Sequence, residues 1–497
     1  MKNTQLTAGE NSSRTTSENK TSAASIGVSF SPQGLSGLSL SASKAQGNSK
    51  ENASTYTPTE IAAKDALQIE SGKDTNILGS TVQGDKVTAN IGGNLNIETL
   101  QEKETYEEKN TSAGFDLSWD IRAGKFSKPT IGLSASRGTI DSHYRSARGQ
   151  SGIFAGKGGF DIYVEKNTDL KGAVIASEAE AGKNRLSTGT FSFSDLENGA
   201  DYSAKSIGAE YHHYGSYDKM SRQEKNKVYN TIGLSPSLSM PAKGDANSTT
   251  SSAVARGTID IRENPTQDIS ALNRDTNNAL NELGRIFDKQ KIEEQQELAK
   301  AFGEEAFRLA HNLPDDGSGR KVAVHAIIGG IMSQITGTGF ASGAIGAGVN
   351  EAIIGEIKKI KDPGTAQIVS AIVGAAAAKA VGGNAGSGAS AAASGTKWNY
   401  TLIAPNPING LVLLGGVILI IQENGRLAVQ DAITDTVEEV PYIIDVAIQT
   451  AMSAYDSGIL LLDDLREEVT DAFILYSDYG DLTPEEIIGK YQDGSVD

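Results

Sequence analysis

Short runs of alternating apolar and polar residues fill the first half of the chain. One face of each run carries the apolar side chains, as in Ile26–Phe30, Val87–Ile91 and Leu95–Ile97. Alternation with a period of two, interrupted by Gly, Asn and Asp, predicts half-buried β-strands. We therefore expect successive short strands from Ala66 to Ile97 and from Gly159 to Phe193.

The sequence of these strands recurs along the chain with a period of about 93 residues. Leu40–Ser43 recurs as Leu133–Ser136, and Asp74–Gly79 recurs in similar form as Asn167–Gly172. A repeat of short strands predicts a solenoid, in which each coil covers the apolar face of its neighbour. We predict a right-handed β-solenoid over residues 1–210, and an array of β-sandwiches is the alternative.

The alternation ends near residue 210. Residues 211–275 are rich in Gly, Ser, Asn and Lys, which predicts a linker and the end of the repeat region. His212 and His213 lie there, but adjacent residues of an extended segment point to opposite sides, so a surface loop is favoured over a metal site. After Asp275 the apolar spacing becomes helical and predicts a helical neck over 276–318.

Residues 319–396 form a block rich in Gly and Ala. Within it, Val322–Asn350 contains no Asp, Glu, Lys or Arg and is long enough to cross a bilayer as a helix. Small residues also allow helices to approach closely in a soluble bundle. We predict a tightly packed helical domain, with membrane-active helices as the alternative.

Residues 397–497 predict an acidic, mostly helical C-terminal region. The apolar segment Leu411–Ile421 is suited either to a buried core or to a membrane contact. Four carboxylates at helical spacing could hold Mg²⁺ or Ca²⁺, although such runs are usually solvated: Asp463, Asp464, Glu467 and Glu468. No catalytic motif is recognisable, so an enzymatic activity is left open and no cofactor is predicted.

The charge balance argues against nucleic-acid binding. The 497-residue chain has 62 acidic and 45 basic side chains, and 18 of the acidic but only 3 of the basic ones lie in residues 423–497. The last histidine is His325, so this region also has no histidine base. Because phosphate binding needs basic groups, we predict no nucleic-acid partner. Cysteine is absent, which excludes disulfides and thiolate chemistry.

The repeat region resembles the haemagglutinin repeats of filamentous-haemagglutinin-type exoproteins. The likeness covers roughly residues 1–275 and is carried by Gly93–Glu98, Asn110–Gly114, Ser151–Gly156, Asn167–Ser177 and Leu186–Thr190. It implies a very large secreted rod, exported by a two-partner system and used in adhesion or contact-dependent growth inhibition. No secretory signal is recognisable after Met1, so we expect a C-terminal fragment of a longer polypeptide.

The Gly/Ala block resembles the pre-toxin region of contact-dependent growth inhibition exoproteins. Val324–Gly330, Gly346–Ala352 and Ala375–Gly382 carry this likeness. In that family a Val-Glu-Asn-Asn motif often marks the boundary before the toxin. The motif is missing here, and the expected place of the boundary is occupied by Gly395, Thr396, Lys397, Trp398 and Asn399.

The resemblance implies a protein of the cell surface that presents a C-terminal toxin to neighbouring bacteria. The implied partners are an outer-membrane transporter of a two-partner system, a receptor on the target cell and a possible small immunity protein. A structural adhesin stalk without an active toxin is the alternative function. A third is a pore-forming effector that contacts membranes through Val322–Asn350 or Leu411–Ile421.

Overall fold

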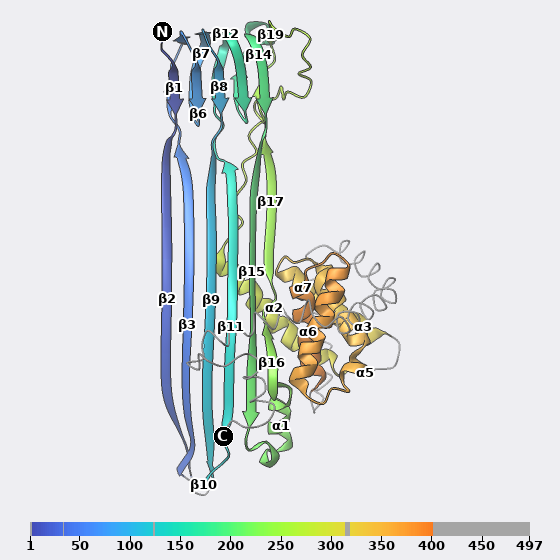
Figure 1. Cartoon of the computed structure of the whole chain (residues 1–497). Helices are drawn as coiled ribbons and strands as arrows, with labels where there is room; N and C mark the ends of the chain where they lie inside the picture. The colour runs from blue at the N-terminus through green and yellow to red at the C-terminus, as the bar shows by residue number, and fades with distance from the viewer. Residues whose placement is uncertain (1, 33, 123–124, 314–318, 401–497) are drawn as a thin grey trace.

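The computed structural model describes residues 2–32, 34–122, 125–313 and 319–400. It shows a long β-rod with a small helical domain against its side (Figure 1). A stack of short parallel strands forms one end of the rod, and a wall of long antiparallel strands forms the rest. The succession of mostly β structure and then helices confirms the mixed fold class predicted from the sequence.

The stack is an 11-stranded sheet whose strands pair in parallel. Its alternating apolar side chains point inward, and Val87, Ile91, Ile97 and Ile162 are no more than 1% exposed. Period-two alternation correctly predicted strands between Ala66 and Ile97 and between Gly159 and Phe193. The strands of the stack are β1 (Thr4–Thr7), β4 (Glu60–Ala62), β5 (Ala66–Ser71), β6 (Thr75–Leu78), β7 (Thr81–Ile91), β8 (Leu95–Glu98), β12 (Gly152–Lys171), β13 (Val174–Ser177), β14 (Arg185–Ser194), β18 (Ala253–Val254) and β19 (Thr258–Ile261).

The strand register explains the 93-residue period. Strands of the stack pair with later ones along the chain, and the length of chain between two paired strands is called a step. Thr75 pairs with Leu95 after a short step, whereas Leu95 pairs with Thr168 after a much longer step. The longer step contains an inserted hairpin of long strands, and the two kinds of step alternate. One repeat is therefore two successive turns of the stack, of which the second carries a hairpin.

The hairpins of successive repeats pair side by side and form the 8-stranded wall. Six strands follow the order β16-β15-β11-β9-β3-β2, while β10 pairs with β9 and β17 pairs with β15. Each new hairpin joins the previous one by an antiparallel ladder, β3 with β9 and β11 with β15. The wall strands are β2 (Gly9–Ser31), β3 (Gly34–Thr57), β9 (Gln101–Arg122), β10 (Lys125–Phe126), β11 (Thr130–Ala147), β15 (Leu196–Tyr214), β16 (Gly233–Leu238) and β17 (Ala242–Thr250).

A right-handed solenoid throughout residues 1–210 is not confirmed. Only one end of the rod consists of short parallel strands, and the wall is antiparallel. The reason lies in segments such as Gly9–Ala24, which are polar on both faces and give no alternation to detect. Such strands are held by ladder hydrogen bonds to their neighbours and not by a buried face.

Two expectations for residues 211–318 are corrected by the structure. The predicted linker contains ordered β16 and β17, and also α1 (Arg222–Val228) with the 3₁₀ turns η2 (Tyr217–Lys219) and η3 (Tyr229–Thr231). The neck is not helical before Lys289. There the chain runs along the wall, where the Tyr144 hydroxyl donates to the Leu283 carbonyl at 2.9 Å and Arg285 pairs with Glu104 at 2.7 Å. Contacts with the wall thus replace helical hydrogen bonds.

The helical domain begins with α2 and packs its helices through small residues. Gly343 approaches Gly329, and Gly388 approaches Gly374, so closely that an added Cβ would lie 1.9 to 2.2 Å from a backbone oxygen. No helix in the described part of the chain is long and apolar enough to span a membrane. The helices are α2 (Lys289–Ala310), α3 (Arg320–Ile335), α4 (Phe340–Ala352), α5 (Ile354–Ile357), α6 (Pro363–Ala380) and α7 (Ala385–Asn399); one more 3₁₀ turn, η1 (Ala181–Lys183), lies in the stack.

Candidate functional site

The helical domain is fixed to the wall by contacts along β16 and the turns before it. The Asn230 side-chain amide donates to the Lys397 carbonyl at 3.2 Å, and Gln367 donates to the Asn230 carbonyl at 2.9 Å. A Cβ on Gly364, in the first turn of α6, would lie 1.9 Å from the Leu234 carbonyl oxygen. Only a glycine allows the helix to approach the strand this closely.

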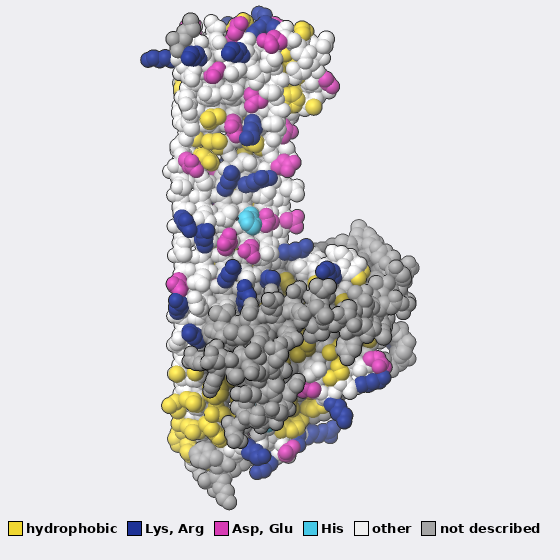
Figure 2. All heavy atoms as spheres, in the orientation of Figure 1, with side chains coloured by type: hydrophobic (Ala, Val, Ile, Leu, Met, Phe, Trp, Pro, Cys, Tyr) yellow, Lys and Arg dark blue, Asp and Glu magenta, His cyan; other side chains and the backbone are white. Residues whose placement is uncertain are grey.

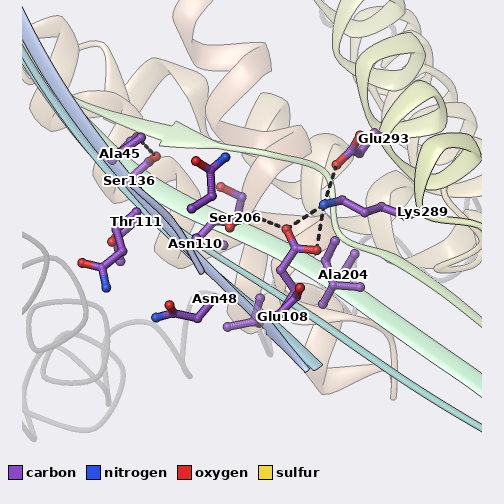
Figure 3. Close-up of a pocket in the computed structure, with 18 of the residues that line it drawn as sticks. Ala45, Asn48, Glu108, Asn110, Thr111, Ser136, Ala204, Ser206, Lys289 and Glu293 are labelled. Atoms are coloured by element: carbon purple, nitrogen blue, oxygen red, sulfur yellow. Dashed lines mark hydrogen bonds and ion pairs between the residues drawn. The ribbon is translucent and has the colours of Figure 1, made fainter. Parts of the chain in front are cut away.

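A polar groove of about 430 Å³ lies between the wall and α2 (Figure 3). Glu108 on β9 points into it and receives the Lys289 ammonium at 2.7 Å from each carboxylate oxygen. Asn110 donates to the same carboxylate at 2.6 Å, and the Tyr106 hydroxyl also donates to it. Burial alone would raise the pKa of Glu108, but the hydrogen bonds from Lys289, Tyr106 and Asn110 outweigh burial and lower the pKa.

Glu108 and Lys289 therefore form a satisfied ion pair that holds the start of α2 on the wall. Asp288 caps the same helix, since its carboxylate accepts from the Lys291 N–H at 3.2 Å. The rest of the groove carries mainly hydroxyl, amide and small side chains, as Figure 3 shows for Asn48, Thr111 and Ser206. This arrangement anchors a helix on the wall.

A second polar cluster lies inside the helical domain and consists of Lys321, His325, Glu351 and Asn399. We call it the buried cluster. The Lys321 ammonium lies 3.3 Å from Glu351, and both side chains are less than 10% exposed. The Asn399 amide donates to Glu351 at 2.8 Å, while its oxygen accepts from Lys321 at 3.3 Å. The cluster thus joins the start of α3, the end of α4 and the last residue of α7.

His325 completes this cluster without a hydrogen bond of its own. Its Nδ1 lies 3.2 Å from a Glu351 oxygen, but neither ring nitrogen has a partner in hydrogen-bonding geometry. Burial, together with the nearby Lys321 charge, lowers the pKa of His325 to about 3, so the ring is neutral at pH 7. Burial likewise raises the pKa of Glu351, against the opposing effect of Lys321.

Sequence reasoning missed both clusters, although one of them left a signal. Lys321 and Glu351 are the two charged residues that directly bound the uncharged run Val322–Asn350. A hairpin of two helices brings the ends of such a run together, so the flanking charges can pair. Nothing comparable marks Glu108 and Lys289, because they come from distant elements that only the wall brings together.

The predicted boundary residues occupy the last turn of α7. Gly395 and Asn399 face the buried cluster, since a Cβ on Gly395 would lie 3.3 Å from His325 Nδ1. Thr396 is fully buried and shares a 2.6 Å hydrogen bond with Ser370. Lys397 and Trp398 are partly exposed beside them. Whether a functional boundary falls here stays a prediction.

The other candidates are placed as follows. His212 and His213 lie on β15, opposite Gly132 and Ile131, and His212 approaches Glu210 at 3.9 Å. Among the residues that the structure describes, no group of three or more His, Asp or Glu side chains is placed to hold a metal ion. The four weak metal candidates and Leu411–Ile421 lie outside the described residues. Val322–Asn350 forms most of the α3–α4 hairpin.

The fold and these sites define a class of elongated β-repeat protein that carries a docked helical domain at the end of its repeats. Residues 1–113 match the haemagglutinin repeat family. A deoxyribonuclease CdiA of Yersinia pseudotuberculosis is 34% identical over 327 residues, or 65% of this chain and 29% of that protein. A tRNA nuclease CdiA of Yersinia mollaretii is 37% identical over 63% of this chain and 10% of that protein.

A toxin CdiA of Escherichia coli extends the similarity further, with 32% identity over 78% of this chain and 14% of that protein. These matches show that the chain is similar to proteins of the filamentous-haemagglutinin and CdiA type. It spans only about 10 to 29% of the length of these curated relatives. No solved structure matches it significantly.

Proposed function

We propose that this chain is the stalk and presenting domain of a contact-dependent growth inhibition exoprotein, and that it carries a C-terminal effector toward neighbouring bacteria. One observation carries this proposal. Relatives named as a deoxyribonuclease and as a tRNA nuclease share similar identity with the same chain over about two thirds of its length. What they share with this chain is therefore suited to carrying an effector and does not determine which reaction the effector performs.

The geometry of the helical domain supports the same role. Asn399 is clamped by Lys321 and Glu351. The Tyr400 hydroxyl lies 2.9 Å from the Ile357 carbonyl at the end of α5 and 2.8 Å from the Ile360 carbonyl just after it, and shares its hydrogen between the two. The last residues that the structure describes, Asn399 and Tyr400, are thus held in place by the helical domain. A fixed attachment is what a presenting domain requires, because a loose one would not transmit the orientation of the stalk.

The finer structural assignments belong to this proposal. We take the parallel stack to be a right-handed β-solenoid. We take residues 1–210 as the repeat region, 211–275 as its end, 276–318 as the neck, 319–396 as the pre-toxin-like domain and 397–497 as the effector region. The boundary would then fall at Gly395–Asn399, in the last turn of α7.

The proposed partners follow from the proposed role. They are an outer-membrane transporter that exports the chain, a receptor on the target cell and a small immunity protein that protects the producer. The location would be the cell surface or the medium. The acidic character of residues 423–497 favours a target other than nucleic acid, in contrast to the nuclease relatives.

Expression of residues 397–497 inside a bacterium from an inducible promoter tests the proposal. We expect growth arrest that is relieved by co-expression of the small protein encoded directly downstream. A version with an early stop codon serves as the control. Growth without any effect would favour the structural adhesin instead, and rapid loss of membrane potential would favour a pore-forming effector.

A further inference from the structure

The two edges of the wall differ sharply. A sheet edge exposes unpaired N–H and C=O groups and invites another strand to pair with it. Successive hairpins of this wall use that property twice, since β9 pairs with the edge of β3 and β15 pairs with the edge of β11. The outer edges are β16 with β17 on one side and β2 on the other.

The helical domain covers the β16 edge. Gly364 of α6 lies directly against the Leu234 carbonyl, and the Ser390 hydroxyl of α7 donates to the Leu238 carbonyl at 3.4 Å. At the start of β17, the Lys243 N–H donates to the Thr336 carbonyl of the α3–α4 turn at 3.0 Å. The helices thus cover outward groups along β16 and at the start of β17.

A proline removes one outward donor of the same edge, and the other outward positions depend on the helices for cover. The Ser239 N–H donates to the Ser206 carbonyl on β15. Because backbone groups alternate in direction along a strand, the N–H groups of odd-numbered residues in β16 point toward β15 and those of even-numbered residues point away from it. Pro236 occupies one of the outward positions and has no N–H to offer. Proline at an edge strand is a recognised device against further strand pairing.

The β2 edge has no such cover among the described residues. β2 pairs with β3 on one side only, and nearly every residue from Gly9 to Phe30 is exposed. Ile26 begins an apolar row that continues across the wall through Leu40 and Leu117. Ile26 is 75% exposed and Phe30 is 77% exposed, and Figure 2 shows apolar side chains gathered at this end of the wall.

We propose that the helical domain is a terminating cap that blocks strand addition at β16, so that the wall accepts a further strand only at β2. The partner that fits β2 is a β-hairpin of the same repeat, because that junction already occurs twice in this wall. Continuity of the apolar row supports this partner, since Leu40, which has β9 beside it, is 39% exposed against 75% for Ile26. In a purified sample, the β16 edge of a second copy can take this part once its helical cover is displaced.

One substitution displaces the cap where α6 meets β16. Gly364→Val places a side chain where even a Cβ would lie 1.9 Å from the Leu234 carbonyl oxygen, so α6 must move away from β16. Gly355→Val on α5 is the matched control, because nothing lies within 4 Å of a Cβ there. Once β16 is free, it can pair with β2 of another copy. This contact does not close on itself and therefore builds open chains.

Analytical ultracentrifugation of the full chain gives the readout. We expect the weight-average mass of the Gly364→Val variant to at least double with concentration, while the Gly355→Val variant and the parent stay at 52.1 kDa. Adding lysines at exposed positions of β2, as Ser13→Lys, Ser17→Lys and Thr21→Lys, should return the Gly364→Val variant to the monomer, because edge lysines oppose pairing.

Two results would overturn the proposal. A Gly364→Val variant that remains monomeric, with faster hydrogen exchange at β16 to prove that the edge is free, would show that the cap blocks nothing. Assembly that persists with the β2 lysines in place would show that β2 is not the accepting edge. Should the valine unfold the helices, as circular dichroism would reveal, Gly364→Ala provides the same comparison with a smaller displacement.

Discussion

The buried cluster allows a sharp test of how the helical domain is held together. Lys321→Met removes the ammonium and leaves Glu351 buried, with a side chain only 2% exposed. Glu351→Leu makes the opposite change and leaves the Lys321 ammonium buried. The double substitution replaces both charges by apolar groups of similar size.

The structure sets the size of each effect. Breaking a buried ion pair by removing one partner costs about 3 to 5 kcal/mol, whereas replacing both partners is often close to neutral. Glu351 keeps its 2.8 Å hydrogen bond from Asn399 in the Lys321→Met variant, so we expect the lower end of this range. The double variant loses that bond as well, and we expect a cost of about 1 to 2 kcal/mol.

Tryptophan fluorescence during urea unfolding measures these values. The chain has two tryptophans, and a Trp119→Phe background leaves Trp398 on α7 as the probe of the helical domain. Lys300→Met, at an exposed position of α2, is the matched control and should change stability by less than about 0.5 kcal/mol. Single variants that cost less than 1 kcal/mol, or a double variant that costs the sum of both, would refute the reasoning.

Three further predictions concern other parts of the chain. The pKa of His325 falls from its ordinary 6.5 to about 3 on folding, so the unfolded state binds a proton at a higher pH than the folded state does. The free energy of unfolding must therefore decrease as the pH drops below 6.5. Between pH 7 and pH 4.5 the parent should lose about 2 to 3 kcal/mol more than a His325→Met variant in the tryptophan assay. Gly343→Ala should cost at least about 1 to 3 kcal/mol in the same assay, since its Cβ would lie 1.9 Å from a carbonyl oxygen of α3, whereas Gly355→Ala should have little effect. Ile91→Ala in the stack should cost about 2 to 5 kcal/mol in thermal unfolding followed by circular dichroism, and Ile26→Ala, at a 75% exposed position, should cost less than about 0.5 kcal/mol.

The sequence was informative where apolar residues alternate. Val87, Ala89 and Ile91 point into the stack as period two requires, and each is at most 5% exposed. The 93-residue offset between Asp74–Gly79 and Asn167–Gly172 likewise corresponds to equivalent strands, β6 and the end of β12. In these segments burial of one face determines the structure, so the pattern carries the information.

The wall could not be predicted in the same way. Arg14 to Lys20 on β2 are exposed on both faces, and only the ladder to β3 makes this polar segment a strand. The groove site at Glu108 depends on the wall in turn. Lys289 meets Glu108 because the chain follows the wall before α2 begins, and no local pattern records that path.

The central claim is that each repeat contributes one hairpin and that hairpins of successive repeats pair directly in a single wall. Cysteine cross-linking tests it cleanly, because the chain contains no cysteine. Ser39 on β3 lies directly opposite Ser118 on β9, whereas Ser43 pairs four positions further along, roughly 13 Å from Ser118 along the strand. A short thiol cross-linker such as dibromobimane should join the Ser39→Cys/Ser118→Cys pair and leave Ser43→Cys/Ser118→Cys unlinked. Equal linking of both pairs, or of neither, would contradict the wall.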